Sequence, residues 1–540
     1  MAVIIFVVSL LAFPDWAYSW GLLAALGIVV VGGVVSFIAN FRQAFEKPPD
    51  PPPPPPAAPQ IDAENLKAGR DITIQQQIGD VIQAASQPVN FLHQLPRPPD
   101  DFTGREVELK ELLDNFDKGA TIFGLRGMGG IGKTALALKL AAVLTPSYPD
   151  AQFFLDLQGT SDSPLTPAAA LAQVVRAYHP EGMLPESEGE LRRLYLAVLH
   201  SQRALLLIDN ARDAAQVLPL LPPPGCALLV TSRQRLTLPG LIPKDLNTLP
   251  PADARELLIK IAPRMAPTPG PSPVAEGYAT GEGTADEIAR LCGYLPLALR
   301  AAGSLLAATP DLSPARYAAQ LRDERARLER IGEEGVERDV TASFNLSYAR
   351  LPEAAARVFR QMAVFPGWFD ALADEAVCDD EGHAHLSELV WRSLVDYDET
   401  AQRYRLHDPA RLFADARLTE PERAAAQQRY AEYYWVVLNA ADELFLKGGE
   451  HVGRGLALFD LEWANIQAGQ AWAAANPRRN DAAARLCSAY PDAGAYVLDL
   501  RLHPREKIHW LEAALASARH MGDRSMEGMH LGNLGLAYAA

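Results

Sequence analysis

Cysteine is scarce in this chain of 540 residues. The four cysteines are Cys226, Cys292, Cys378 and Cys487. They lie far apart in the sequence and form no CxxC pair, which excludes a disulfide-rich scaffold and a zinc ribbon and is typical of a reducing compartment. We expect all four to be small buried side chains.

Basic residues are also few, because 50 Lys and Arg stand against 66 Asp and Glu, which gives a net charge of −16. A protein that coats nucleic acid needs a basic surface to bind phosphates, so this balance argues against that class. At ~100–200 residues per domain, the length indicates three to five domains and excludes both a single small fold and a wholly disordered chain.

A long stretch without any charge precedes Arg42. Within it, Trp20–Ala39 would span ~30 Å as a helix, which is the thickness of a bilayer core. Basic residues follow at Arg42 and Lys47, so the positive-inside rule places the rest of the chain in the cytoplasm. We predict that residues 1–46 anchor the chain in a membrane, as one helix or as a hairpin that includes residues 2–13. A secretory signal is disfavoured because no basic residue precedes the apolar run, and a buried core hairpin is the alternative.

Nine of the twelve residues in Pro48–Pro59 are proline. Such a run favours polyproline II, so residues 47–60 are predicted to be a stiff spacer reaching ~35 Å, although an SH3-like partner could also bind there. In the linker that follows, residues 61–95, apolar and polar side chains alternate weakly. This pattern suggests a short strand pair or an adaptor segment.

The octapeptide GMGGIGKT, residues 127–134, lies between an apolar strand and a helix and satisfies GxxxxGK[ST]. Such a loop directs backbone N–H groups at phosphates, so we expect ATP or ADP here. Lys133 would reach the β- and γ-phosphates, and the Thr134 hydroxyl would bind Mg²⁺. The remaining phosphate-binding residues are expected to be Gly127, Gly129, Gly130, Ile131 and Gly132.

Two further apolar strands carry polar residues at their ends. Ala204–Asp209 is an apolar run that ends in an acid, so Asp209 is predicted to hold Mg²⁺ together with Thr134. Ala227–Val230 is followed by Arg233, which is either a cation at the same edge of the sheet or an ordinary surface residue. Strands that alternate with helices predict a doubly wound parallel sheet, an α/β P-loop NTPase domain over residues 96–249.

These motifs resemble the NB-ARC branch of the STAND signalling NTPases, the group of plant disease-resistance proteins and apoptosome scaffolds. Over about residues 96–417, the amino-acid sequence is similar to that of the NTPase part of actinobacterial antibiotic regulatory proteins. The resemblance implies that Gly104 and Arg105, in FTGREVE, cover the adenine side, and that Arg233 reads the γ-phosphate.

Two later motifs extend the resemblance. CGYLPLALR matches the GxP element, which implies that Pro296 packs at the nucleotide. RYRLHDPARLFA matches the MHD element, which implies that His407 contacts the β-phosphate of ADP and that Asp408 is its supporting acid.

Many family members follow the metal-binding aspartate with a second acid, whereas this chain has Asn210. An amide can position water but cannot take its proton, so we predict slow hydrolysis, with Lys133, Asp209, Asn210 and Arg233 as the catalytic set.

The rest of the body follows the family layout, with a helical domain at 250–335 and a winged helix at 336–417. The winged helix holds nine arginines, no lysine and fifteen acids, a net of −6, so DNA is not expected as a partner. His383 and His385 lack a second ligand pair, so we expect surface residues and not a metal site.

Residues 418–540 are predicted to be helical, with a core stripe formed by Tyr430, Tyr433, Tyr434 and Trp435. The last residues resemble tetratricopeptide material, the start of an α-solenoid: Ala513–Gly522 fits a second helix, and Leu534, Gly535 and Tyr538 fit a first. Because a solenoid needs about three repeats, we expect that residue 540 is not the natural end.

Together with the resemblance to bacterial proteins, these features predict a switch that is anchored in the bacterial inner membrane and whose body lies in the cytoplasm. ADP would hold it off, and ATP would turn it on and favour self-association. The C-terminal repeats would sense a protein or ligand. The alternatives are a transcriptional regulator with an NB-ARC module and a constitutive P-loop ATPase.

Overall fold

Five strands form one parallel sheet in the computed structural model, which describes residues 74–84 and 92–539 except 162–163, 181, 183, 186, 267–280, 331–334 and 479. The strand order is β2-β3-β4-β1-β5, and every pairing is parallel. The strands are β1 (Ile122–Arg126), β2 (Ala151–Asp156), β3 (Ala204–Ala211), β4 (Ala227–Ser232) and β5 (Leu241–Asp245). β3 and β4 are buried almost throughout, because helices cover both faces of the sheet.

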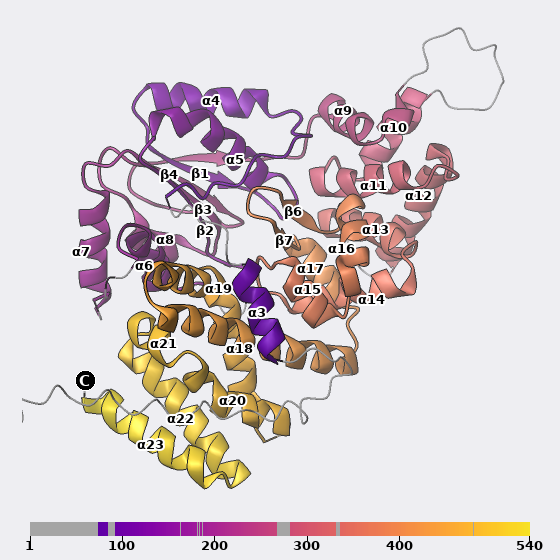
Figure 1. Ribbon diagram of the computed structural model, residues 1–540. Helices are drawn as coiled ribbons and strands as arrows, with labels where there is room; N and C mark the ends of the chain where they lie inside the picture. The colour runs from indigo at the N-terminus through magenta and orange to yellow at the C-terminus, as the bar shows by residue number, and fades with distance from the viewer. Residues whose placement is uncertain are drawn as a thin grey trace, which may run out of the picture. The chain divides into compact units, whose positions relative to one another are not determined.

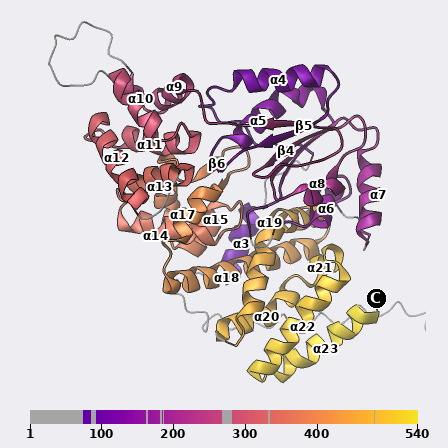
Figure 2. The same cartoon turned by 180° about the vertical axis from the view of Figure 1, so that it is seen from behind.

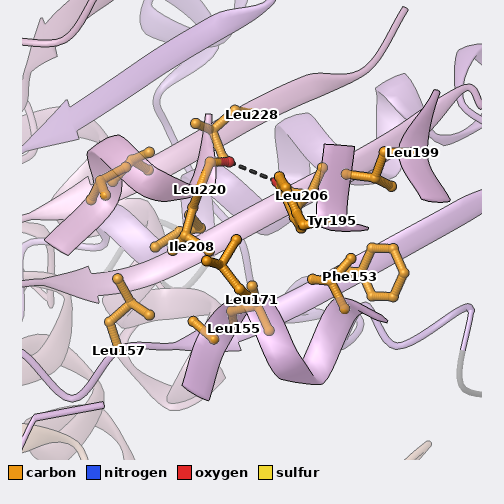
Figure 3. Close-up of a cluster of buried hydrophobic side chains, with 14 of the residues drawn as sticks. Phe153, Leu155, Leu157, Leu171, Tyr195, Leu199, Leu206, Ile208, Leu220 and Leu228 are labelled. Carbon is orange, nitrogen blue, oxygen red and sulfur yellow. Dashed lines mark hydrogen bonds between the residues drawn. The ribbon is translucent and has the colours of Figure 1, made fainter. Parts of the chain in front are cut away.

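Helices pack on both faces of this sheet, as Figure 1 shows. On one face, α4 (Glu106–Asp117) and α5 (Lys133–Leu144) bury Leu112 and Leu136 against side chains of β1, β3 and β4. On the other face, α6 (Pro167–Tyr178) and α7 (Glu188–Leu199) form the cluster in Figure 3, where the Tyr195 hydroxyl donates to the Leu220 carbonyl at 2.7 Å. The short helix α8 (Ala214–Val217) follows β3. The predicted doubly wound P-loop NTPase fold is confirmed.

The polar ends of the strands meet at one edge of the sheet. Asp156 at the end of β2 is the register partner of Asp209 in β3, and Arg126 of β1 is the partner of Ser232 in β4. In parallel sheets ligands bind outside these carboxyl ends. This edge is therefore where the predicted site residues should gather.

A second group of helices follows the sheet. The expected helical segment contains α9 (Pro251–Ile261), α10 (Gly281–Leu291), α11 (Pro296–Ala308) and α12 (Pro314–Arg330). The segment predicted to be a winged helix contains the antiparallel hairpin β6–β7 and five helices. Their bounds are α13 (Gly335–Tyr348), α14 (Glu353–Gln361), α15 (Ala371–Cys378), α16 (Ala384–Trp391), β6 (Asp396–Asp398), β7 (Arg403–Arg405) and α17 (Asp408–Asp415).

The C-terminal part is helical, as predicted. Its helices are α18 (Glu420–Lys447), α19 (Glu450–Ala475), α20 (Asp481–Ala493), α21 (Ala495–Arg501), α22 (Pro504–Met521) and α23 (Arg524–Ala539). The expected aromatic stripe on α18 is buried, which confirms its core role. α22 ends at Met521, with Gly522 as its cap, and packs against α23. Both expected helices are therefore present, whereas the tetratricopeptide assignment stays a prediction.

Shorter elements complete the described chain. Single 3-10 turns occupy Thr145–Ser147, Leu218–Leu220, Pro263–Met265, Met362–Val364 and Glu381–His383. All four cysteines are free and buried, as expected from their spacing.

The strand pair suggested within residues 61–95 is wrong. Ile74–Ala84 forms the helix α3, which packs against α18 in both views (Figures 1 and 2). Ile78 and Val81 are buried there, and Arg454 of α19 donates to the Ile82 carbonyl at 3.2 Å. These two apolar residues are three apart, which places them on one face of a helix, so the weak alternation around them was misleading.

The predicted anchor, residues 1–46, and the spacer, residues 47–60, lie outside the described residues. Within the part that the structure describes, no helix is long and apolar enough to cross a bilayer.

Candidate nucleotide-binding site

A cavity of about 90 Å³ opens at the carboxyl edge of the sheet. One wall comes from the sheet and the phosphate loop, and the other comes from residues 405–411, which we call the clamp segment. The predicted residues that line this cavity are Gly129, Gly130, Lys133, Thr134, Asp209, Asn210, Arg233, His407 and Asp408. The fold thus gathers nine of the predicted residues, drawn from four separate stretches of sequence.

The phosphate loop has the backbone that its glycines permit. Gly130 and Gly132 have φ of 76° and 90°, a region that favours glycine, and α5 begins directly afterwards at Lys133. The Lys133 Nζ donates to the carbonyls of Gly127 and Met128, both at 2.9 Å. Burial lowers the pKa of Lys133 to about 8, and the nearby Arg233 lowers it further while Asp209 opposes the shift.

The two predicted Mg²⁺ ligands lie side by side. The Thr134 hydroxyl donates to Oδ1 of Asp209 at 2.8 Å, and the Thr231 hydroxyl donates to the same oxygen at 2.6 Å. Asp209 is 4% exposed. Because Mg²⁺ prefers oxygen ligands and is often held by one carboxylate beside phosphates, this donor set fits the ion.

A second carboxyl faces the same place. Asp156 lines the cavity beside Asp209, its register partner on the neighbouring strand, and its Oδ1 accepts the Gln158 backbone N–H at 2.9 Å. Burial and the neighbouring Asp209 raise the pKa of Asp156 to about 7, although Arg405 opposes this shift.

Six predicted residues lie outside the cavity lining, namely Gly104, Arg105, Gly127, Ile131, Gly132 and Pro296. Gly127, Ile131 and Gly132 belong to the phosphate loop itself, and Arg105 and Pro296 contact that loop from outside. Arg105 is 4% exposed and donates to the Ile131 carbonyl at 3.1 Å and to the Asn247 carbonyl. Pro296 begins α11 beside Gly132, and the next N–H, of Leu297, donates to the Gly130 carbonyl at 3.3 Å.

The acid expected to support His407 is a different residue. His407 Nε2 lies 2.8 Å from Oδ2 of Asp396 in β6. Burial opposes charge on Asp396, yet His407 and Arg405 hold the pKa of that carboxyl well below its usual range. Asp408 instead accepts from Arg233 Nη2 at 3.0 Å and from the Thr160 hydroxyl at 2.7 Å. Since Asp408 is the first residue of α17, its side chain turns toward β4 while His407 faces the hairpin.

Asn210 belongs to the same network. Its φ is 55°, its backbone N–H donates to the Thr231 hydroxyl at 2.9 Å, and its side-chain amide donates to the Thr160 hydroxyl at 3.3 Å. Thr160 therefore connects Asn210 in β3 with Asp408 in the clamp segment.

Sequence reasoning missed five residues of this site: Asp156, Thr160, Thr231, Asp396 and Arg405. Asp156 carried the same signal as Asp209, because it too ends an apolar strand. Arg405 stands two positions before His407 in a motif already noted. Thr160 and Asp396 had no signal, since only the fold brings them to the site.

That His383 and His385 are surface residues stays a prediction. Within the described residues, no group of three or more His, Cys, Asp and Glu side chains could hold a metal ion. His383 instead lies 3.5 Å from Glu375, and it is partly exposed.

No protein-family model matches this chain. The regulatory protein AfsR of Streptomyces coelicolor is 38% identical over 367 residues, which cover 63% of this chain and 35% of AfsR. A protein named as an HTH-type transcriptional regulator from Mycobacterium tuberculosis is 29% identical over 416 residues, or 73% of this chain and 44% of that protein. A disease resistance protein of Arabidopsis thaliana is 25% identical over 356 residues, or 58% of this chain and 37% of that protein.

Among solved structures, the STAND protein PH0952 from Pyrococcus horikoshii, described with a tetratricopeptide repeat sensor, matches with a TM-score of 0.40 and 16% identity. The match covers 82% of this chain and 75% of that chain. The P-loop NTPase fold of this chain rests on its own strand order and phosphate loop.

The chain is therefore similar to AfsR-type regulators and to plant disease resistance proteins. It spans about a third of the length of AfsR. The expectation that DNA is not a partner gains no support, because one of these relatives is named as a transcriptional regulator.

Proposed function

We propose that the chain is a nucleotide-dependent signalling switch of the NB-ARC type, closed with ADP and open and self-associating with ATP and Mg²⁺. The observation that carries this proposal is the ion pair between Arg233 and Asp408, at 3.0 Å, which joins the end of β4 to the clamp segment.

This ion pair makes closure sensitive to the γ-phosphate. Arg233 is the cation that a third phosphate would attract, and in the closed arrangement the Asp408 carboxylate takes that cation. A γ-phosphate would compete with Asp408 for Arg233 and so favour release of the clamp segment. The two side chains are 36% and 24% exposed, so the pair contributes about 1 kcal/mol and can be broken by a ligand.

The phosphate loop supplies the binding energy common to both nucleotides. Lys133 and the loop N–H groups would hold the β-phosphate of either nucleotide. In the ATP state, Thr134 and Asp209 would also hold Mg²⁺, which neutralises charge on the phosphates. His407 lines the same cavity and is 36% exposed, so its ring is available to a β-phosphate.

Hydrolysis by this switch should be slow. Asn210 takes the place where many relatives of this type carry an acid, and its amide is held by Thr160 and cannot accept a proton. Slow turnover suits a switch, because the ATP state then persists long enough to signal.

The sensing and membrane parts of the proposal come from the sequence. The C-terminal helices would receive a protein or ligand, and α6 of the NTPase domain contacts them through Arg176, which lies 3.2 Å from Asp460 of α19. Residues 1–46 would hold the body at the cytoplasmic face of a membrane. Extraction of the expressed chain from membranes only by detergent supports this location, whereas release by salt alone contradicts it.

A transcriptional regulator is the second candidate, and the name of the relative from Mycobacterium tuberculosis favours it. Salt-dependent binding of this chain to duplex DNA, with a slope that reflects several phosphate contacts, would support that function. A constitutive ATPase is the third, and it requires turnover well above about one per minute without any effector.

The central test is size-exclusion chromatography of the chain in ADP and in ATP with Mg²⁺. We expect a monomer in ADP and a larger species in ATP, and K133A should bind neither nucleotide and stay monomeric. Binding of both nucleotides without any change in oligomeric state would contradict the switch.

A further inference from the structure

Arg405 reaches from the clamp segment to a predicted Mg²⁺ ligand. It is the last residue of β7, and its Nη1 lies 3.7 Å from Oδ2 of Asp209. The Arg405 side chain is 13% exposed and that of Asp209 is 6% exposed. A buried charge from the winged-helix segment is thus paired with the carboxylate that β3 contributes to the nucleotide site.

Neighbouring groups hold this guanidinium in place. It stacks on the Trp368 ring, 4.6 Å from the centroid, and Nε lies 3.4 Å from Oδ2 of Asp396. Arg403, two residues earlier on β7, donates to the Trp368 carbonyl at 2.8 Å. A guanidinium carries its positive charge throughout the ordinary pH range. These contacts therefore fix the Arg405 charge beside Asp209 in the closed arrangement.

The two oxygens of Asp209 have different neighbours. Oδ1 accepts from the hydroxyls of Thr134 and Thr231, whereas Oδ2 faces Arg405. A divalent cation bound to Thr134 and Asp209 would lie within a few ångströms of the guanidinium, in a site with little solvent to screen the two charges. Closure of the clamp segment and binding of the metal therefore compete for one carboxylate.

We propose that Arg405 determines the form of nucleotide that the closed site accepts, by supplying at Asp209 the positive charge that Mg²⁺ supplies in the open site. The closed site then takes the diphosphate without its metal ion. Mg²⁺ binds only when Arg405 withdraws with the clamp segment. This inference rests on the proposed nucleotide switch and adds the metal as a second input to it.

The first test uses the unmodified 540-residue chain and a fluorescent ADP analogue (mant-ADP). Its dissociation rate is measured in EDTA and in millimolar Mg²⁺. A site in which Mg²⁺ bridges protein and phosphates holds the nucleotide more tightly with the metal. We expect Mg²⁺ to leave the ADP dissociation rate unchanged or to raise it. Slowing by about tenfold or more would overturn the proposal.

The second test changes the residue. In R405Q, Mg²⁺ should slow mant-ADP dissociation by about tenfold, because the competing charge is gone. R405K keeps the charge and should behave like the parent. R392Q is the matched control, because it removes an arginine of the predicted winged-helix segment that pairs with Glu388 of the adjoining helix α16.

The outcomes separate the two proposals. If the parent binds no mant-ADP in either buffer, the nucleotide switch itself is wrong. If the parent binds it and R405Q, shown to be folded by its melting curve, has the parent's Mg²⁺ dependence, the role of Arg405 is wrong. Should R405Q fail to fold, the measurement on the parent chain still decides.

Discussion

Arg233 and Asp408 are 175 positions apart in sequence, and their side chains lie 3.0 Å from each other. The ion pair joins the residue after β4 to the first residue of α17, so it lies across the contact between the NTPase domain and the clamp segment. Its partial exposure limits its strength, which is what a reversible contact requires.

The first prediction concerns this pair. R233Q and D408N should each raise the ADP dissociation rate several-fold, and the double variant should add little to either. A double-mutant cycle on mant-ADP dissociation rates should give a coupling energy of about 1 kcal/mol. R255Q is the control, because Arg255 pairs with Asp286 at 3.4 Å between α9 and α10, away from the cavity. Fully additive effects would show that the pair does not hold the clamp segment.

The second prediction is a pH dependence of nucleotide binding. Because burial lowers the pKa of Lys133 to about 8, its amine loses its charge above that pH in the free protein. Phosphates favour the charged form, so binding should take up a proton between about pH 8 and about pH 10, and affinity should fall by up to about tenfold per pH unit. Calorimetry in buffers with different ionisation enthalpies measures this uptake. Proton release over this range would contradict the assignment of Lys133 to the phosphates.

The third prediction concerns a buried carboxyl in α15. Burial raises the pKa of Asp374 to about 8, and the nearby Asp380 adds to the shift. Between about pH 4 and about pH 8 the folded chain keeps a proton that the unfolded chain has lost, so the free energy of unfolding falls as pH rises through this range. D374N removes this titration. Between pH 5 and pH 8, the free energy of unfolding of D374N should therefore rise by about 2–4 kcal/mol relative to that of the parent.

Denaturant unfolding at the two pH values measures this difference. D379N is the matched control, since Asp379 is a half-exposed neighbour that lies 3.8 Å from Arg357. Equal pH dependence of D374N and the parent would show that Asp374 does not titrate in this range.

The fourth prediction concerns the contact between the NTPase domain and the C-terminal helices. Asp460 lies 3.2 Å from Arg176 of α6 and 3.0 Å from Arg501 of α21. D460N would leave two largely buried guanidinium groups without their shared acid. We expect this change to lower the free energy of unfolding by about 2–4 kcal/mol. D499N is the control, because Asp499 is exposed and pairs with Lys507 at the surface. Equal urea midpoints for D460N and D499N would contradict this role.

The phosphate loop could be predicted from sequence because its ligands are contiguous. Eight successive residues supply the N–H groups, the lysine and the hydroxyl. The turn needs backbone conformations that favour glycine, and the glycines are visible in the sequence. Asp209 could be predicted for a related reason, since an apolar strand of that length must end at the edge of a sheet. Asp156 carried the same pattern, and it was missed because no second motif drew attention to it.

The helix α3 shows where local patterns are ambiguous. Alternation near residues 71–83 favoured strands, whereas the buried pair Ile78 and Val81 fits one face of a helix that packs on α18. Over so few apolar residues, the helical repeat of about 3.6 residues and the strand repeat of about two are hard to tell apart. The surface that buries Ile78 and Val81 belongs to α18, more than three hundred residues away in the sequence.

The sequence alone determined the parallel sheet, the phosphate loop, the Mg²⁺ ligands Thr134 and Asp209 as a predicted pair, and the helical C-terminal part. Only the tertiary structure decided that Asp396 supports His407, that Asp408 pairs with Arg233, and that Arg405 reaches Asp209. The first group depends on neighbours in the chain and on hydrophobic periodicity. The second depends on how α17 and the β6–β7 hairpin dock on the sheet edge, because charges that are far apart in sequence acquire partners only when packing brings them together and removes the water between them.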